Sequence, residues 1–238
     1  MSETKQVSEV MAPEINMQDV EEKSRRFLEG KMTSSFRINM HPVDAYKSLL
    51  SYYISAVRLR NVKCELDEDT RNNIYRLALA LTSTTPKAGV MLCGTCGNGK
   101  TTLVYAMRFF INELNSRGHF SFLDQYFRAA FKIYDAKEIV MLSRSYKDWK
   151  AITADHMLAI DDLGKEPTEI MDYGNLLSPV VDLLERRYNE QRFTIVTTNL
   201  LPRQLSEKYG ARMQDRFREM FEVIHFKQKS YRGNSKRV

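Results

Sequence analysis

Cysteine is scarce in this chain of 238 residues, and its scarcity argues against a fold held together by disulfides. Three cysteines are an odd number and make no disulfide framework. Cys93 and Cys96 form a C-x-x-C pair, but no second pair of cysteines or histidines stands at the spacing of a zinc site. A redox or zinc role would also compete with the backbone conformation implied by the glycines around Cys96. We expect neither kind of site.

Long apolar runs are also missing from the sequence. No run approaches the roughly 20 residues that a helix needs to cross a bilayer. The N-terminus, MSETKQVSEVMAPEINMQ, has no basic start followed by an apolar segment, so it does not resemble a secretory signal. We therefore expect a cytoplasmic protein that has no membrane partner.

The composition itself is that of a soluble globular protein, with 43% hydrophobic and 28% charged residues. A chain of this length can bury a substantial core, as one large domain or as two smaller ones. The net charge of +6 and the pI near 9.1 suit a polyanionic partner such as DNA.

The N-terminal third is predicted to hold a tail and two helices. The first two dozen residues are polar and rich in Glu, and nothing in them repeats at a helical period, so residues 1–40 are predicted to be a flexible acidic tail. From Pro42, apolar residues recur at three- and four-residue spacing and predict a helix that ends near Arg60. A second helix is predicted in DEDTRNNIYRLALALTS, with Asp67 or Asp69 capping its start.

The segment TTPKAG then breaks the helical pattern and places a boundary near residues 84–89. Residues 41–85 therefore form a small N-terminal helical region, which is a possible binding region for a partner protein. Residues 86–238 are predicted to form a second region of a different kind.

Beyond this boundary, short apolar runs alternate with helical periods, which is typical of a parallel sheet covered by helices. Four runs are predicted to be strands: GVMLC, FKIYDA, HMLAIDD and RFTIVTTN. Helices are predicted in TTLVYAMRFFINELNSRG, in AKEIVMLSR and, despite Pro179, in most of YGNLLSPVVDLLERRYNEQ. We therefore predict an α/β fold with its ligand site at the carboxyl edge of the sheet, where the strands end in polar residues.

A phosphate-binding loop is predicted where the first of these strands meets the first helix. The pattern is Gly94-x-x-x-x-Gly99-Lys100-Thr101, and it has the strand before it and the helix after it that such a loop requires. Glycines let backbone N–H groups converge on phosphate oxygens, Lys100 would reach the β and γ phosphates, and the Thr101 hydroxyl would ligate Mg²⁺. The alternative is a plain glycine-rich turn. The predicted ATP-binding residues of the loop are Gly94, Thr95, Cys96, Gly97, Asn98, Gly99, Lys100, Thr101 and Thr102.

Polar residues end two later strands. Asp161 and Asp162 follow the run HMLAI, and adjacent strand residues point to opposite sides, so we predict that they divide the work. Asp161 would hold Mg²⁺ through its water shell, and Asp162 would orient or deprotonate the attacking water. Asn199 ends RFTIVTTN and is predicted to bridge that water and the γ-phosphate. The alternatives are a helix cap or solvated strand end for the carboxylates, and a strand-to-turn transition for Asn199.

Four segments behind the phosphate loop, HMLAIDDLGKEP, LLERRYNEQRFTIVTTNL, GARMQDRF and SYR, resemble the AAA+ ATPases of the DnaC-type helicase loaders and the IstB-type transposition helpers. The resemblance covers residues 86–233, and IDDLG, the stretch from RRY to TTNL and the terminal SYR are its most specific pieces. It implies a P-loop NTPase of the AAA+ type with a very short C-terminal lid. It also implies ATP and Mg²⁺ as cofactors and a homo-oligomeric ring or filament when ATP is bound.

The resemblance assigns roles to arginines that the sequence alone leaves as surface residues paired with Asp215 or Glu219. It implies that Arg216 is the arginine finger inserted into a neighbouring subunit's ATP site, with Arg212 four residues earlier on the same helix face. It also implies that Arg232, in SYR, contacts the phosphates of its own subunit. Hydrolysis would then depend on assembly.

Three functions follow from these motifs. The first is an ATPase that delivers a replicative helicase to single-stranded DNA. The second is a transposition helper that oligomerises on duplex DNA and recruits a transposase. The third is a P-loop nucleotide or metabolite kinase, which has no use for Asn199 or for an arginine finger from another subunit.

Three further segments bear on partners. RSYKDWK interleaves basic and aromatic residues as single-strand binders do, although such a stretch is more often an amphipathic helix, here with Tyr146 and Trp149 turned inward. The basic end HFKQKSYRGNSKRV suits contacts with backbone phosphates. The aromatic segment HFSFLDQYFRAAF has no counterpart in the resemblance. Its aromatic residues either pack within the protein or dock a partner.

Overall fold

The computed structural model describes residues 16–29, 36–61, 64, 66–116, 131–172, 174–227 and 230–231. The chain divides into two units, residues 1–32 and residues 33–238. Most of the aromatic segment HFSFLDQYFRAAF and most of the basic C-terminus lie outside the described residues.

The described residues of the first unit, 16–29, form the helix α1 (Met17–Glu29), where the sequence analysis found no helical period. Residues 17–29 were predicted to lie within a flexible tail, and the structure places a helix there. The Asn16 side chain accepts a hydrogen bond from the Gln18 backbone, which caps the helix start, and Lys23 pairs with Asp19 one turn earlier at 2.7 Å.

The second unit is built on a parallel sheet of five strands in the order β2-β3-β6-β1-β7. The strands are β1 (Gly89–Gly94), β2 (Lys132–Asp135), β3 (Leu158–Leu163), β6 (Thr194–Thr198) and β7 (Phe221–Phe226). The predicted α/β parallel sheet is therefore confirmed. The strand β7 was not predicted, because it follows a long helix without a glycine or proline to mark the change.

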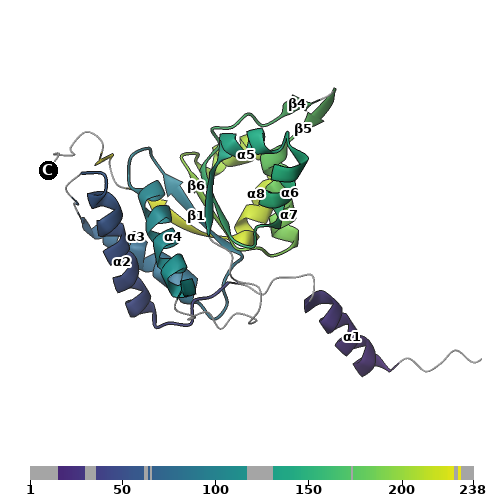
Figure 1. Ribbon diagram of the computed structural model, residues 1–238, viewed down its shortest axis with the longest axis horizontal. Coiled ribbons are helices and arrows are strands. Elements are labelled where there is room, and N and C mark those ends of the chain that lie inside the picture. Colours follow the sequence, from purple (N-terminus) through teal and green to yellow (C-terminus); the bar gives the residue numbers. More distant parts are fainter. Residues whose placement is uncertain are drawn as a thin grey trace, which may run out of the picture. The chain divides into compact units, whose positions relative to one another are not determined.

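Helices cover both faces of the sheet, as Figure 1 shows. One face carries α2 (Pro42–Arg58), α3 (Glu68–Thr82) and α4 (Lys100–Ser116). The other face carries α5 (Ala136–Leu142), α6 (Tyr146–Ala154), α7 (Pro179–Asn189) and α8 (Pro202–Met220). Alternate residues of β1 supply the two cores, with Val90 and Leu92 in the first and Met91 and Cys93 in the second.

The helices α2 and α3 share their core with the sheet. Leu49 and Tyr53 of α2 and Leu77 of α3 pack in the same buried cluster as Leu92 of β1 and Ile195 of β6. The segment near residues 84–89 is therefore a connection within one packed unit, and the N-terminal helical region has no separate core among the described residues. Of the two predicted caps of α3, Asp67 is the one used, since its side chain accepts the Thr70 N–H at 2.7 Å.

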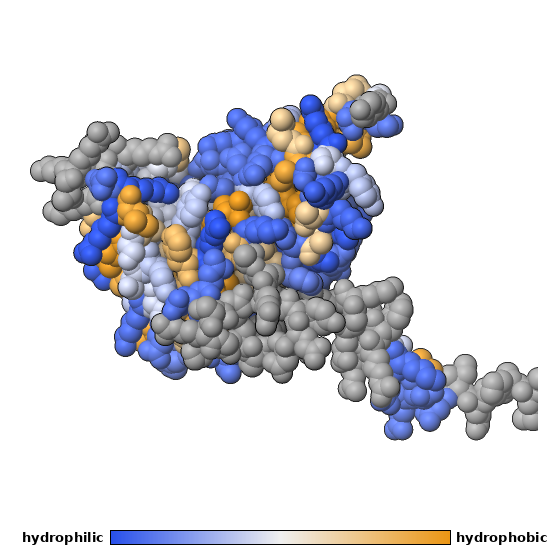
Figure 2. Space-filling view, in the orientation of Figure 1, coloured by the Kyte–Doolittle hydropathy of each residue, from blue (hydrophilic) through white to orange (hydrophobic). Residues whose placement is uncertain are grey.

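The predicted helix in YGNLLSPVVDLLERRYNEQ is α7, which covers most of this stretch, and the described residues of the stretch before Pro179 are not helical. A small antiparallel hairpin of β4 (Ile170–Asp172) and β5 (Asn175–Leu177) precedes α7, and Pro179 begins that helix. Proline suits the first turn because no helical acceptor is needed for its missing N–H. Figure 2 shows hydrophobic residues at the end of this hairpin, where Met171 and Leu176 face each other and are exposed.

The helix α6 holds the predicted basic and aromatic segment, and the structure separates its two aromatic side chains. Trp149 is partly buried against the second core, whereas Tyr146 is 81% exposed. The predicted inward packing is therefore correct for Trp149 and wrong for Tyr146.

Within the residues that the structure describes, no helix has the length and hydrophobicity to span a bilayer.

Candidate nucleotide site

The loop between β1 and α4 has the backbone that its glycines predict. Gly94, Gly97 and Gly99 all have positive φ, at 151°, 83° and 93°. A Cβ on Gly99 would lie 2.5 Å from the Tyr53 hydroxyl, and one on Gly94 would lie 2.3 Å from the Phe226 carbonyl oxygen. These two glycines are therefore required by the packing of the protein itself as well as by the loop conformation.

The predicted phosphate-binding residues lie along this loop with different exposures. Thr95 and Cys96 are exposed at its tip, whereas Asn98 and Thr102 are buried. The Asn98 amide donates to the Phe226 carbonyl at 3.2 Å, and this hydrogen bond anchors the loop to β7. Cys93 and Cys96 are both free thiols.

Lys100 begins α4 and is 5% exposed. Its Nζ donates to the Gly94 and Thr95 carbonyls at 2.8 and 2.7 Å and to the side-chain oxygens of Asn98 and Asn199 at 3.0 Å each. Burial lowers the pKa of Lys100, and neighbouring acidic groups oppose that shift. The ammonium group is therefore held inside the loop by oxygens that a phosphate group could replace.

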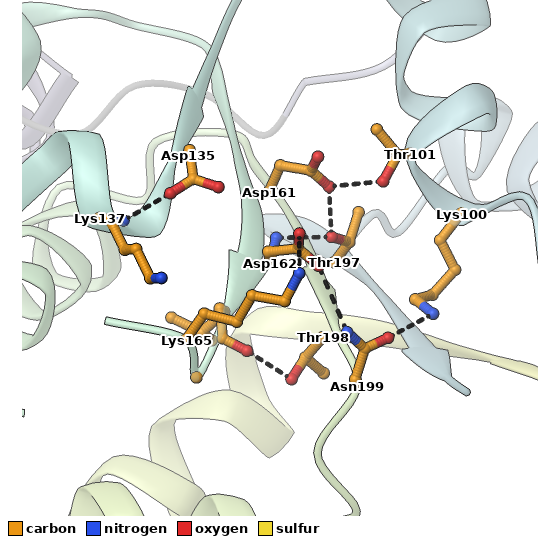
Figure 3. Close-up of polar contacts among 12 residues, drawn as sticks. Lys100, Thr101, Asp135, Lys137, Asp161, Asp162, Lys165, Thr197, Thr198 and Asn199 are labelled. Carbon is orange, nitrogen blue, oxygen red and sulfur yellow. Dashed lines mark hydrogen bonds and ion pairs between the residues drawn. The ribbon is translucent and has the colours of Figure 1, made fainter. Parts of the chain in front are cut away.

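Thr101 and Asp161 meet across the gap between α4 and β3. The Thr101 hydroxyl donates to Asp161 Oδ1 at 3.0 Å, and Figure 3 shows the two side chains pointing toward each other. A hydroxyl and a carboxylate oxygen are hard ligands of the kind that Mg²⁺ takes, with water and phosphate oxygens completing its shell. The donor set fits the predicted division of roles for this pair.

Asp162 does not alternate with Asp161 as a regular strand would require, so that part of the prediction was wrong. Ile160 pairs with Val196 and Leu163 with Thr198, which leaves two residues of β3 opposite the single residue Thr197. Asp162 has φ 59°, a left-handed conformation that Asp tolerates better than most residues. This β-bulge gives both carboxylates partners at the same carboxyl edge.

Asn199 connects the two halves of the site. Its side-chain oxygen accepts from Lys100 Nζ at 3.0 Å, and its amide nitrogen donates to Asp162 Oδ1 at 3.3 Å. The strand order explains this position, because β6 lies between β1 and β3 and its end therefore falls between the loop and the carboxylates (Figure 3). Thr197 of β6 bonds both aspartates and joins the contacts into one polar cluster, whose other members are Lys100 and Thr101 of α4, Asp161 and Asp162 of β3, and Asn199 just after β6.

No protein-family model and no curated protein matches this sequence. Solved structures do match the fold. A structure described as the DnaC helicase loader aligns with a TM-score of 0.52 and 21% identity, over 69% of this chain and 94% of that one. A putative primosome component from Streptococcus pyogenes serotype M3 aligns with a TM-score of 0.51 and 18% identity, over 72% of this chain and 86% of that one. This chain has the fold of the DnaC helicase loader.

The two predicted arginines Arg212 and Arg216 lie on α8, beyond a kink at Gly210, where φ is 82° and ψ is 162°. Arg212 is exposed. Arg216 pairs with the Glu185 carboxylate, and its guanidinium lies 5.4 Å from the centre of the Tyr188 ring. Asp215 pairs with Arg218 instead, so the sequence-based partner for Arg216 was wrong. The predicted Arg232 lies outside the described residues.

Two residues of the candidate site were missed by sequence reasoning. Lys165, three residues after Asp162, donates to its Oδ2 at 2.5 Å, and this hydrogen bond raises the pKa of Lys165. Tyr231 lies far along the chain, yet its N–H donates to the Gly97 carbonyl at 2.9 Å. The Tyr231 hydroxyl donates to Asp67 Oδ2 at 2.6 Å. Lys165 could have been found from the sequence, because it closely follows the two carboxylates. Tyr231 could not, because only the fold brings it to the loop.

Proposed function

We propose that this chain is an ATPase that binds ATP and Mg²⁺ in the loop between β1 and α4 and serves as a helicase loader. The observation that carries the proposal is the polar cluster described above, in which Lys100 and Asp162 are linked through Asn199. The fold supports it as well, since the aligned proteins include a helicase loader and a putative primosome component.

Binding would use the residues of the loop. Backbone N–H groups of Gly94 to Thr102 and the N-terminus of α4 face the phosphates, and Lys100 exchanges its carbonyl partners for phosphate oxygens. The Thr101 hydroxyl and the Asp161 carboxylate would hold Mg²⁺, which would offset the negative charge of the phosphates. Bound ATP–Mg²⁺ supplies the γ-phosphate that is transferred to water.

Hydrolysis would use the carboxylate and the amide at the ends of β3 and β6. Asp162 orients and deprotonates the attacking water. Its ion pair with Lys165 is exchanged for this water, and Lys165, with 47% of its side chain exposed, can turn toward solvent. Asn199 keeps its contact with Asp162 and Lys100, which holds the water and the γ-phosphate in one line.

Arg216 would complete the site of a neighbouring subunit. In the single chain it is held by Glu185 and by the Tyr188 ring, with 15% of its side chain exposed. Delivery to another subunit therefore requires that this pair opens or turns. Hydrolysis then occurs in the homo-oligomer and is slow in the isolated chain.

DNA contacts would involve the exposed face of α6. Tyr146, Lys147 and Lys150 are all exposed there, and their combination of a ring and positive charges suits a single strand. The N-terminal helices α2 and α3 would carry the contact with the helicase, a role that rests on their place outside the nucleotide loop.

Mixing two inactive variants tests assembly-dependent hydrolysis. Arg216→Ala should bind ATP and fail to hydrolyse it, whereas Lys100→Ala should fail to bind ATP and still donate Arg216. A mixture should recover part of the wild-type rate, because some interfaces combine an intact loop with an intact arginine. Arg218→Ala, on the same helix, is the matched control and should keep its activity alone. Absence of recovery at any ratio would contradict the role of Arg216.

Purification of the tagged protein from its native cell tests the partner. Recovery of a replicative helicase, lost when α2 is altered at exposed positions, would support the loader. Recovery of a transposase on duplex DNA would instead favour a transposition helper. Full-rate hydrolysis that does not depend on protein concentration or DNA would contradict both.

A further inference from the structure

The bulge in β3 is held by one side chain of the neighbouring strand, Thr197. Asp161 and Asp162 both lie opposite Thr197 in the parallel pairing of β3 with β6. Figure 3 shows the Thr197 hydroxyl joined to the Asp161 carboxylate and to the Asp162 backbone nitrogen, and Thr197 is completely buried. The sheet therefore fixes the position of this side chain, and water cannot replace its hydroxyl group.

The Thr197 hydroxyl makes one hydrogen bond in each direction. It donates its hydrogen to Asp161 Oδ1 at 2.5 Å, and it accepts the backbone N–H of Asp162 at 2.9 Å. The N–H of Asp162 needs such an acceptor because a bulge leaves the extra residue outside the regular ladder. One hydroxyl thus sets both the direction of the first carboxylate and the backbone of the second.

Thr101 donates to the same oxygen, Asp161 Oδ1, at 3.0 Å. The two hydroxyls approach that oxygen from different elements, α4 and β6. Asp161 is therefore oriented toward the loop from one side by a residue expected to bind the metal and from the other side by a residue in the sheet.

We propose that Thr197 is a positioning residue for the ATPase site, which sets the Mg²⁺-binding carboxylate and the water-orienting carboxylate together. This inference rests on the proposed ATPase function. Without the hydroxyl, the Asp162 N–H loses its acceptor and Asp161 loses one of two donors. The bulge relaxes, and the two carboxylates move apart toward the alternating arrangement of a regular strand.

Thr198, the next residue of the same strand, provides a matched control. It is also completely buried, and it also makes two hydrogen bonds, donating to the Leu163 carbonyl at 2.7 Å and accepting the Leu200 N–H at 3.1 Å. These bonds involve backbone groups outside the carboxylate pair. Thr198→Val therefore removes the same chemistry from the same strand without touching Asp161 or Asp162.

The test compares Thr197→Val, Thr197→Ser and Thr198→Val with the wild type. The first measurement is the affinity for a non-hydrolysable ATP analogue, with Mg²⁺ and with a chelator. The second is kcat and the Mg²⁺ concentration that gives half-maximal rate. The third is the thermal midpoint, which reports the structural cost that both valine variants share.

Thr197→Val should lose most of the Mg²⁺-dependent gain in nucleotide affinity and about 10- to 100-fold in kcat, since small displacements of catalytic groups have effects of this size. Thr197→Ser keeps the hydroxyl and should stay close to wild type. Thr198→Val should lose thermal stability to a similar extent while keeping the wild-type response to Mg²⁺. If both valine variants respond to Mg²⁺ alike, the proposal is overturned.

A crystal structure of Thr197→Val separates this inference from the proposed function. Asp162 should leave the left-handed region in the variant, whether or not the wild type hydrolyses ATP, and a retained bulge would overturn the role of Thr197. If the valine variant does not fold, Thr197→Ala, which introduces no new methyl contact, takes its place in both experiments. A wild type that binds no nucleotide would contradict the proposed function alone.

Discussion

Two buried cations lie at opposite ends of the same sheet, and they differ in what surrounds them. Lys100, at the carboxyl end, is held by two loop carbonyls and two asparagine side chains. Arg187 of α7, at the amino end, is completely buried. It donates to the Asp155, His156 and Phe193 carbonyls and to the Thr194 hydroxyl, which precede or begin β3 and β6.

Burial lowers the pKa of both groups, that of Arg187 to about 9. The planar guanidinium of Arg187 satisfies several fixed acceptors at once, and this geometry ties the starts of two strands to one helix. The ammonium of Lys100 is a compact charge whose partners lie largely in a loop that can rearrange around a ligand. Lys100 is therefore suited to binding a phosphate group, and Arg187 is suited to stabilising the fold.

The sharpest test of this difference is Lys100→Ala. We expect hydrolysis to fall by roughly 1000-fold or more, because the charge that would meet the β and γ phosphates is gone. Thermal stability without nucleotide should change little, since a buried charge is removed together with its desolvation cost. Nucleotide titration and a thermal melt measure the two effects. Lys137→Ala, an exposed lysine near the same edge, should behave as wild type.

Arg187→Lys should have the opposite pattern of effects, with a large loss of stability and little change in nucleotide affinity. A lysine cannot reach all four acceptors, so we expect a loss of about 3 kcal/mol in the free energy of unfolding. Nucleotide affinity of the protein that remains folded should stay within a few-fold of wild type. Urea unfolding measures the loss, and Arg186→Lys, at an exposed neighbouring position, should cost less than about 0.5 kcal/mol. Equal costs at the two positions would break the comparison.

Asp162→Asn separates binding from hydrolysis at the carboxyl end. Asparagine has nearly the same shape and accepts the left-handed backbone, so the bulge should remain. Hydrolysis should fall by about 100-fold or more, because the amide is no base, whereas ATP affinity should be retained. Steady-state rates and a nucleotide titration measure the two. Asp172→Asn in the β4–β5 hairpin is the control.

Tyr231→Phe should have the smallest effect of the four substitutions. It should lower both the stability of the protein and its affinity for ATP. Burial, followed by the hydrogen bond to Asp67, raises the pKa of Tyr231 from its ordinary 10.0 to about 12. The neutral hydroxyl is favoured by folding, so its contribution is complete below pH 10 and is lost as the pH rises toward 12. The variant should lose about 1 kcal/mol at pH 7 to 9.

This loss should shrink in unfolding experiments as the pH approaches 12, where the folded wild type begins to release the hydroxyl proton. ATP affinity should fall modestly, because the Tyr231 backbone bonds the Gly97 carbonyl. Tyr75→Phe, at an exposed position of α3, should show no such pH dependence. A pH-independent loss would contradict the hydrogen bond to Asp67.

The sequence by itself determined the elements whose signal is local. The glycine-rich loop between β1 and α4, the buried runs of four strands and the cap at Asp67 each depend on neighbouring residues along the chain, and all are present. The strand β7, the β4–β5 hairpin and the helix α1 were missed, since short or polar elements leave a weak periodic signal.

Only the tertiary structure decided how the candidate site is completed. Placing β6 between β1 and β3 brings Asn199 between Lys100 and Asp162, and one extra residue in β3 turns Asp162 out of the strand alternation. The contacts of Arg216 with Glu185 and of Tyr231 with Gly97 also join residues distant in sequence. Local propensity fixes what each segment forms, but strand order and register are properties of the whole packed chain, and the geometry of the site follows from them.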